Sequence, residues 1–149
     1  MKKLLVLMLI VGGISSAFIS KDVKETSKVV APQAAGGIEF QKMTLEDAMK
    51  QAKSSGKIIF IDAYTEWCGP CKRMAATAFM DEGVAKLFNS KFINLKIEME
   101  KNADGPIVAQ KYEVKAYPTL LFIDGNGMIK KSVVGMQTAE QLLGIGKSL

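Results

Sequence analysis

An almost unbroken apolar run covers residues 57–64 and ends just before a Cys-x-x-Cys motif formed by Cys68 and Cys71. Runs of this kind are typical of a strand that is buried on both faces of a sheet. Such a strand needs other elements packed against both faces, because its apolar surface is unfavourable in water. The run therefore predicts a layered α/β fold, with the two thiols directly after a central strand and at the start of the next helix.

The rest of the chain supplies further helices and strands. Thr44 and Asp47 resemble a capping box at the start of a helix, and Gly56 ends that helix. Thr138 is the expected cap of the last helix. The turn sequence Asp-Gly-Asn-Gly at 124–127 predicts a hairpin. The order of elements predicts a small α/β sandwich with a mixed sheet. The expected helices cover 45–55, 69–79, 82–88, 105–112 and 139–147, and the expected strands cover 57–64, 92–99, 119–124 and 128–134.

Residues 1–17 have the pattern of a secretory signal peptide. Two lysines precede an apolar stretch over 4–14, and Ser-Ser-Ala at 15–17 supplies small residues at the usual cleavage positions. An uncleaved membrane anchor is the alternative, although the stretch is short for a bilayer span and two glycines interrupt it. Residues 18–37 have no sustained apolar period and predict a flexible linker, with an extra N-terminal strand as the alternative. The folded domain is then expected over 38–149.

Composition excludes several classes of site. The chain has 20 Lys and Arg against 15 Asp and Glu, a net charge of +5, but its longest basic runs are pairs, so no nucleic-acid binding is expected. It has no histidine, which removes His–Cys and Ser–His–Asp catalysis and imidazole metal sites. Two cysteines cannot build a four-thiolate zinc or iron–sulfur site in one chain. We expect neither a metal nor a cofactor.

The Cys-x-x-Cys motif has the layout that a dithiol redox site requires. Cys68 lies where a helix begins, and the helix dipole and unpaired N–H groups there stabilise a thiolate, the form that attacks disulfides. Cys68 is therefore predicted to be the nucleophile, and Cys71, one turn further in, the more buried resolving thiol. Half of a zinc site, a c-type haem site and a structural disulfide are the alternatives. The other zinc ligands and the haem histidine are absent, and so short a disulfide loop removes little unfolded-state entropy.

The stretch 60–74 resembles the active-site strand and helix start of the thioredoxin family, and the resemblance covers 57–149. It implies a three-layer sandwich in which helices flank a central mixed sheet. It also implies that the two cysteines are the redox pair, that Asp62 is the buried acid beneath the second one, and that Lys96 is a strand lysine near that acid. Burial would raise the pKa of the Asp62 carboxyl, and Lys96 would oppose part of the rise. Alternatively, Asp62 ends its strand facing solvent.

The resemblance further implies a face that binds substrate. Pro118 matches the cis-proline that faces the disulfide in the family, Gly135 the glycine that lets substrate approach, and Trp67 the indole beside the site. A cis peptide bond would expose the backbone of Tyr117 for pairing with an extended substrate. The alternatives are an ordinary proline at the start of a strand and plain core packing for Trp67.

The dipeptide between the cysteines indicates the direction of the reaction. Gly69 and Pro70 resemble the reducing members of the family, whereas oxidising members commonly carry Pro-His and isomerases Gly-His. Without histidine, the Cys68 thiolate lacks one cationic stabiliser, so the couple should be more reducing. Gly69, Pro70 and Lys96 are thus expected to tune the pKa values of the site. We expect a monomeric thiol–disulfide oxidoreductase that reduces protein disulfides.

Export would decide the partners of such a protein. The expected location is the bacterial periplasm, or a membrane-anchored position facing it, with disulfide-containing proteins as substrates. Reduction by the cytosolic flavoprotein reductase is then not expected, and a membrane-embedded electron donor takes its place. Two other functions stay open: a non-catalytic binding or chaperone-like module, and an electron-relay partner dedicated to one client.

Overall fold

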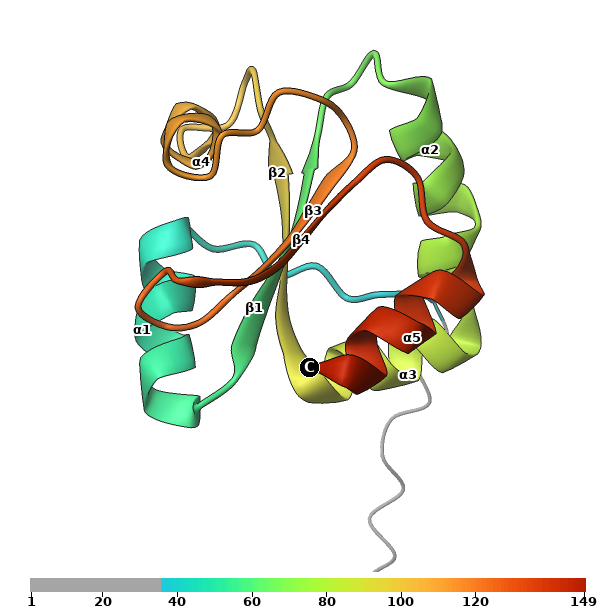
Figure 1. Ribbon diagram of the computed structural model, residues 1–149, viewed down its shortest axis with the longest axis horizontal. Helices are drawn as coiled ribbons and strands as arrows, with labels where there is room; N and C mark the ends of the chain where they lie inside the picture. Colours follow the sequence, from blue (N-terminus) through green and yellow to red (C-terminus); the bar gives the residue numbers. More distant parts are fainter. Residues whose placement is uncertain (1–35) are drawn as a thin grey trace, which may run out of the picture. The chain divides into compact units, whose positions relative to one another are not determined.

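The computed structural model describes residues 36–149, which form a four-stranded sheet with helices on both of its faces (Figure 1). The predicted signal peptide at 1–17 and the predicted linker up to residue 35 lie outside the described residues. No helix within 36–149 is both long enough and apolar enough to cross a membrane.

The sheet is mixed, as the sequence predicts. It contains β1 (Ile58–Tyr64), β2 (Phe92–Glu98), β3 (Thr119–Ile123) and β4 (Ile129–Val134), in the spatial order β2-β1-β3-β4. Strand β1 runs parallel to β2 and antiparallel to β3, and β3 and β4 form the predicted hairpin. The apolar strand β1 therefore lies in the interior of the sheet, where neighbours on both sides satisfy its backbone groups.

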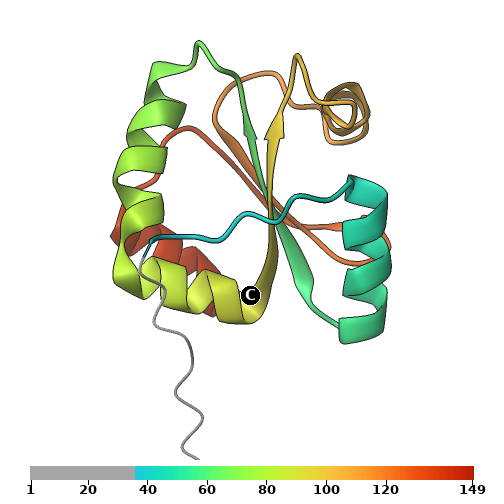
Figure 2. The same ribbon diagram turned by 180° about the vertical axis from the view of Figure 1, so that it is seen from behind.

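Helices cover both faces, which makes the fold a three-layer sandwich (Figures 1 and 2). On one face lie α1 (Leu45–Ser55) and α4 (Gly105–Lys111). On the other lie α2 (Gly69–Ala76), α3 (Glu82–Lys91) and α5 (Ala139–Ser148). The side-chain caps predicted for the first and last helices are present, because Thr44 accepts a hydrogen bond from the Asp47 N–H and Thr138 forms a capping box with Gln141.

Alternate residues of β1 supply the two cores. Ile59 and Ile61 point into the apolar cluster under α1, whereas Phe60 points into the cluster under α2, α3 and α5. The Phe60 ring stacks on Phe122 at a centroid distance of 5.0 Å and meets Phe88 edge-on at 4.9 Å. Pairs of this geometry add to the free energy gained by burying the rings. Because both faces of β1 are buried, apolar and polar residues do not alternate along it before Asp62.

The predicted helix over 69–79 is shorter in the structure, and the prediction was wrong about its end. Helix α2 stops at Ala76, where Thr77 leaves helical geometry while its hydroxyl donates to the Arg73 carbonyl at 2.8 Å. A short 3₁₀ turn, Ala78–Met80, follows. Asp81 then caps α3 by accepting from the Val84 N–H, and α3 continues to Lys91, past the predicted end at residue 88. The Thr77 hydroxyl thus binds the Arg73 carbonyl that the Thr77 N–H would bind in a continued α-helix, and the N–H bonds to the Met74 carbonyl instead.

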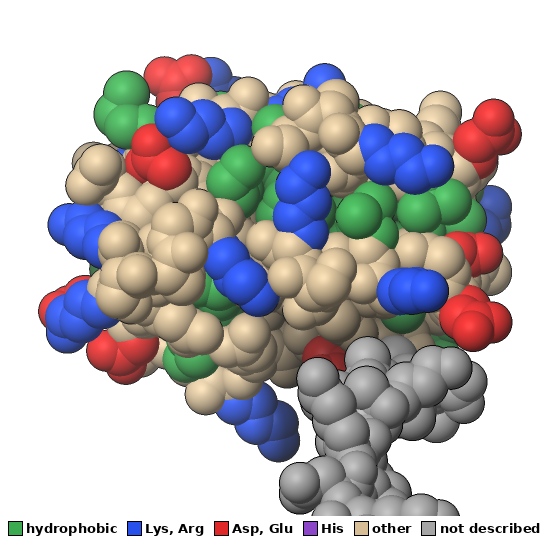
Figure 3. Space-filling view, turned by 90° about the horizontal axis from the view of Figure 1, so that it is seen from below, with side chains coloured by type: hydrophobic (Ala, Val, Ile, Leu, Met, Phe, Trp, Pro, Cys, Tyr) green, Lys and Arg blue, Asp and Glu red, His purple; other side chains and the backbone are tan. Residues whose placement is uncertain are grey.

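Basic side chains do not gather into one patch on the face shown in Figure 3, where they alternate with acidic and apolar groups. The arrangement on this face agrees with the absence of long basic runs in the sequence.

Gly37 packs closely against the 3₁₀ turn. This residue is buried, and its φ of 71° lies in the left-handed region that favours glycine. A Cβ atom at Gly37 would lie 2.6 Å from the Phe79 carbonyl oxygen and 2.7 Å from the Met80 sulfur. Next to it, the Ile38 N–H donates to the same carbonyl at 2.8 Å. Gly37 thus allows the start of the domain to pass close to the 3₁₀ turn.

This close approach predicts that Gly37→Ala lowers the free energy of unfolding by about 1–3 kcal/mol, because alanine adds both a strained φ and a clash with backbone. Gly36→Ala is the matched control, since a Cβ atom there meets nothing within 4 Å. Urea denaturation of the two variants beside the wild type measures the difference. Equal midpoints for both variants would show that the contact at Gly37 does not matter.

Candidate active site

The two cysteines form a disulfide at the N-terminus of α2. Their sulfur atoms are 2.02 Å apart, and Cys68 is the N-cap residue of the helix. The Cys71 N–H donates to the Cys68 sulfur over 3.1 Å. Gly69 and Pro70 form the first turn, where proline's missing N–H leaves no hydrogen bond unmade. The Cys71 N–H and the positive end of the helix dipole therefore both point at the Cys68 sulfur. These are the conditions that stabilise a thiolate.

Exposure does not distinguish the two cysteines. Cys68 is 3 % exposed and Cys71 is 2 % exposed, so the expectation that Cys71 is clearly the more buried thiol is not met in the disulfide form. The difference between them lies in position along the helix. Only the Cys68 sulfur lies at the helix cap and accepts the backbone hydrogen bond. The assignment of Cys68 as nucleophile rests on that position.

Asp62 is a buried carboxylate in the middle of the sheet. It is fully buried, and in the β1–β2 register it lies opposite Lys96. The Lys96 ammonium donates to Asp62 Oδ2 at 2.5 Å, while Oδ1 has no hydrogen-bond partner among the described residues. Burial raises the pKa of Asp62, and the charge and hydrogen bond of Lys96 offset part of that rise. The alternative of a solvent-facing Asp62 is therefore wrong.

Aromatic rings hold the Lys96 side chain over Asp62. Its ammonium lies 4.2 Å from the centre of the Tyr64 ring and 5.4 Å from those of Phe40 and Phe79. Attraction between a cation and the face of a ring stabilises this position. The lysine remains 27 % exposed, so its charge is not fully removed from water. Sequence reasoning missed these three rings, because they come from separate segments of the chain.

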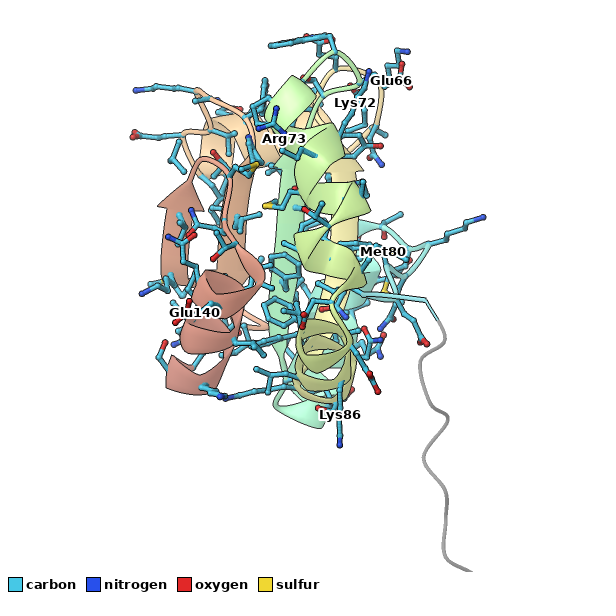
Figure 4. The ribbon with its side chains drawn as sticks, turned by 90° about the vertical axis from the view of Figure 1, so that its right-hand side faces the viewer. Glu66, Lys72, Arg73, Met80, Lys86 and Glu140 are labelled. Atoms are coloured by element: carbon cyan, nitrogen blue, oxygen red, sulfur yellow. A yellow bond between two sulfur atoms is a disulfide. The ribbon has the colours of Figure 1, made fainter. Side chains whose placement is uncertain are left out.

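One pocket connects this ion pair with the disulfide. Its volume is about 400 Å³, and Cys71, Lys96 and Tyr64 are among its lining residues. Thr65, whose buried hydroxyl has no partner among the described residues, also lines it. Glu66 and Lys72, at its rim, lie at the same end of the molecule (Figure 4). The pocket gives water and protons a route to the inner cysteine.

The four residues expected on the substrate face are linked by contacts. Trp67 is 66 % exposed, which excludes core packing as its role, and its ring meets Tyr117 edge-on at 5.9 Å. The Tyr117–Pro118 peptide bond is cis, as expected. The Gly135 N–H donates to the Pro118 carbonyl at 2.7 Å, and Gly135 has a φ of 93° with open space where a side chain would be. Trp67, the neighbour of Cys68 in the chain, is the exposed member of this group, whereas Tyr117 and Gly135 are half-buried and Pro118 is buried.

Sequence reasoning also missed two acidic residues at the end of β2. Glu98 is buried, and its carboxylate accepts one backbone hydrogen bond from the loop that carries Trp67 and two from the loop after β2. Glu100 accepts a hydrogen bond from the Trp67 indole at 3.0 Å. The available signal was a glutamate at the end of a strand rich in apolar residues, where an unpartnered charge is costly.

Relatives with a related site include both bacterial and plant proteins. The thiol:disulfide interchange protein DsbD of Colwellia psychrerythraea is 32 % identical over 108 residues, which cover 70 % of this chain but 18 % of that protein. The H-type thioredoxin of Oryza sativa is 40 % identical over 87 residues, 58 % of this chain and 65 % of the relative. This chain thus matches less than a fifth of the DsbD protein.

Solved structures and the family's sequence profile agree with these relatives. A candidate disulphide-isomerase from Bacteroides thetaiotaomicron is 44 % identical, with a TM-score of 0.67 over 76 % of this chain and 93 % of the other. The thioredoxin of Thermus thermophilus has the same fold, with a TM-score of 0.65 at 19 % identity over 75 % of this chain and 86 % of the other. The thioredoxin profile matches residues 38–146. With its cysteine pair in a disulfide at the start of α2, the chain belongs to the thioredoxin family and carries the thiol–disulfide oxidoreductase site of that family.

Proposed function

We propose that this protein reduces disulfide bonds in other proteins outside the cytoplasm. One observation carries the proposal: the Cys68 sulfur lies at the cap of α2, accepts the Cys71 N–H and is bonded to the Cys71 sulfur. A pair held in this way can exist as a dithiol or as a disulfide, and the helix terminus favours the thiolate of Cys68 in the reduced form. The exposed Trp67 and the backbone of Tyr117 before the cis-bonded Pro118 are the proposed place for the substrate chain.

The proposed reaction transfers two electrons from the dithiol to the substrate. The Cys68 thiolate attacks one sulfur of the substrate disulfide, which forms a mixed disulfide and releases the first substrate thiolate. Cys71 then loses its proton and attacks the Cys68 sulfur. The bond between Cys68 and the substrate breaks, the second substrate thiolate leaves, and the Cys68–Cys71 disulfide remains. A separate reductant must then return two electrons to this disulfide.

Asp62 is the proposed acceptor of the Cys71 proton. Its counter-ion Lys96 and Cys71 line the same pocket, through which a proton can pass. Burial raises the pKa of Asp62 and so brings the carboxyl closer to neutral pH, where a general base is most effective. The charge and hydrogen bond of Lys96 oppose part of this rise. In this account Lys96 tunes the acid and does not touch the substrate.

Export and the source of electrons are proposed from the sequence and the relatives together. The pattern over 1–17 is that of a signal peptide, and 18–37 would then connect it to the domain at 38–149. The DsbD proteins of Colwellia psychrerythraea and Haemophilus ducreyi, named as thiol:disulfide interchange proteins, support a location in the periplasm. A membrane-embedded electron donor is the matching partner for a periplasmic, monomeric reductase, and the Gly69-Pro70 dipeptide supports the reducing direction.

Trapping the mixed disulfide tests the proposed function. We expect the reduced wild-type protein to reduce insulin, which precipitates when its chains separate. Cys71→Ser should retain a covalent adduct with a disulfide-containing peptide, because no second thiol can release it, whereas Cys68→Ser should form none. Mass spectrometry under non-reducing conditions detects the adduct. A wild-type protein that leaves insulin intact, or an adduct that forms through Cys71 alone, would contradict the proposal.

Substitution of Asp62 tests the proposed base. Asp62→Asn should leave formation of the mixed disulfide unchanged but slow its resolution by about 10²-fold, within the range usual for general-base catalysis. The deficit should shrink as pH rises toward the pKa of the Cys71 thiol, since hydroxide can then remove the proton. Rapid-mixing kinetics between pH 6 and pH 9 follow both steps. Asp47→Asn, on the opposite face of the sheet, is the matched control, and equal resolution rates in the two variants would exclude the base role.

A further inference from the structure

We propose that Glu98 is a positioning residue that holds the Trp67 side of the substrate face in place. The proposal rests on the function proposed above and assigns a role to a carboxylate that takes no part in the dithiol chemistry. Glu98 ends β2, beside the two loops that follow β1 and β2. It is only 7 % exposed, although glutamate is rarely buried without a specific set of partners.

The Glu98 carboxylate joins these two loops through backbone hydrogen bonds. One oxygen accepts from the Glu66 N–H at 3.2 Å, in the loop between β1 and α2. The other oxygen accepts from the Glu100 N–H at 2.9 Å and from the Lys101 N–H, both in the loop after β2. Hydrogen bonds to a charged acceptor are about twice as strong as neutral ones, and these three satisfy a charge that would be costly to bury alone.

Side chains of the same two loops meet again at the surface. The Trp67 indole donates to Glu100, and Lys101 forms an ion pair with Glu66. Both partners of each contact lie within one residue of an N–H group that Glu98 binds. Glu98 therefore sets the spacing of the loops, and Glu100 in turn sets the orientation of the Trp67 ring against Tyr117.

The chemistry of the site explains why a carboxylate is needed here. Its two oxygens are both acceptors, so they can bind N–H groups on opposite sides at once. A glutamine has one acceptor oxygen and one NH₂ group. Whichever way its amide is turned, the NH₂ faces an N–H donor of one loop, and that loop loses its attachment. Glu98→Gln should therefore loosen one loop while keeping the size of the side chain.

The expected effect is on substrate binding rather than on thiol chemistry. For reduction of a disulfide-bonded protein such as insulin, Glu98→Gln should raise KM about tenfold with little change in kcat, the signature of a lost binding interaction. Reduction of a small aromatic disulfide, which does not need the Trp67 surface, should stay within about twofold of the wild type. Trp67 is the only tryptophan of the chain, so its fluorescence anisotropy should report a more mobile ring.

A double-mutant cycle separates positioning of Trp67 from a general effect on the fold. We expect Glu98→Gln to raise KM for insulin in the wild-type background but to have no further effect in the Trp67→Ala background. Glu140→Gln, an exposed charge change on α5 away from the site, is the matched control (Figure 4). The positioning role is wrong if the effects of Glu98→Gln and Trp67→Ala on KM add. It is also wrong if Glu98→Gln slows reduction of the small disulfide as strongly as reduction of insulin.

Glu100→Ala keeps the proposal testable if Glu98→Gln does not fold. This substitution is exposed and removes the acceptor of the Trp67 indole, so it should raise KM for insulin in the same way. An unchanged KM for Glu100→Ala would overturn the proposal. A wild-type protein that does not reduce insulin at all would instead contradict the proposed function, and the anisotropy of Trp67 would still test the positioning role.

Discussion

The ion pair between Asp62 and Lys96 is the constraint on which the site depends. Asp62 belongs to the inner strand β1 and Lys96 to the edge strand β2, and the parallel register of these strands places the two residues opposite each other. Because the carboxylate is fully buried, folding favours its protonated form, and its pKa rises. By linkage, the folded protein binds more protons than the unfolded chain between the two pKa values, so stability falls as pH rises through this window. The fold thus retains a buried carboxyl that costs stability when ionised, as expected of a residue with the proposed role in proton transfer.

The two buried acids of the site, Asp62 and Glu98, differ in their hydrogen-bond partners. Asp62 has one cationic partner and one oxygen with no partner among the described residues, an arrangement suited to exchanging a proton. Glu98 uses both oxygens to accept backbone N–H groups, an arrangement suited to holding loops. These surroundings support the roles proposed above, proton transfer for Asp62 and substrate positioning for Glu98. The pocket beside Cys71 and the surface of Trp67 lie at the two places where these functions are needed.

Much of the fold follows from local patterns in the sequence. The apolar run over 57–64 predicts a central strand, the Thr44 and Thr138 caps predict two helix starts, and the Asp-Gly-Asn-Gly turn predicts the hairpin. These features succeed because each depends on residues that are close in the chain. The break after Ala76 and the close approach at Gly37 depend on contacts made only after folding, namely with the Arg73 carbonyl and with the 3₁₀ turn.

The candidate site shows the same division. Position in the motif identifies the cysteines, and the resemblance to the thioredoxin family identifies Asp62, Lys96 and Pro118. The Glu98 hydrogen bonds and the rings around Lys96 join segments that are far apart in the sequence, so no local pattern could reveal them. Exposure of the two cysteines was predicted from helix position, but the disulfide leaves both sulfurs almost equally covered.

A titration of the Asp62 carboxyl carbon by ¹³C NMR tests the account most directly. The oxidised protein is the right sample, since its cysteines are in the disulfide and do not titrate. The account predicts a pKa for Asp62 above the ordinary aspartate value of about 4. Asp124 supplies an internal reference, because hydrogen bonds from the Met128 N–H and the Lys130 side chain lower its pKa. An Asp62 pKa at or below the ordinary value would show that Lys96 outweighs burial, and would contradict the account of Asp62 as the proton acceptor.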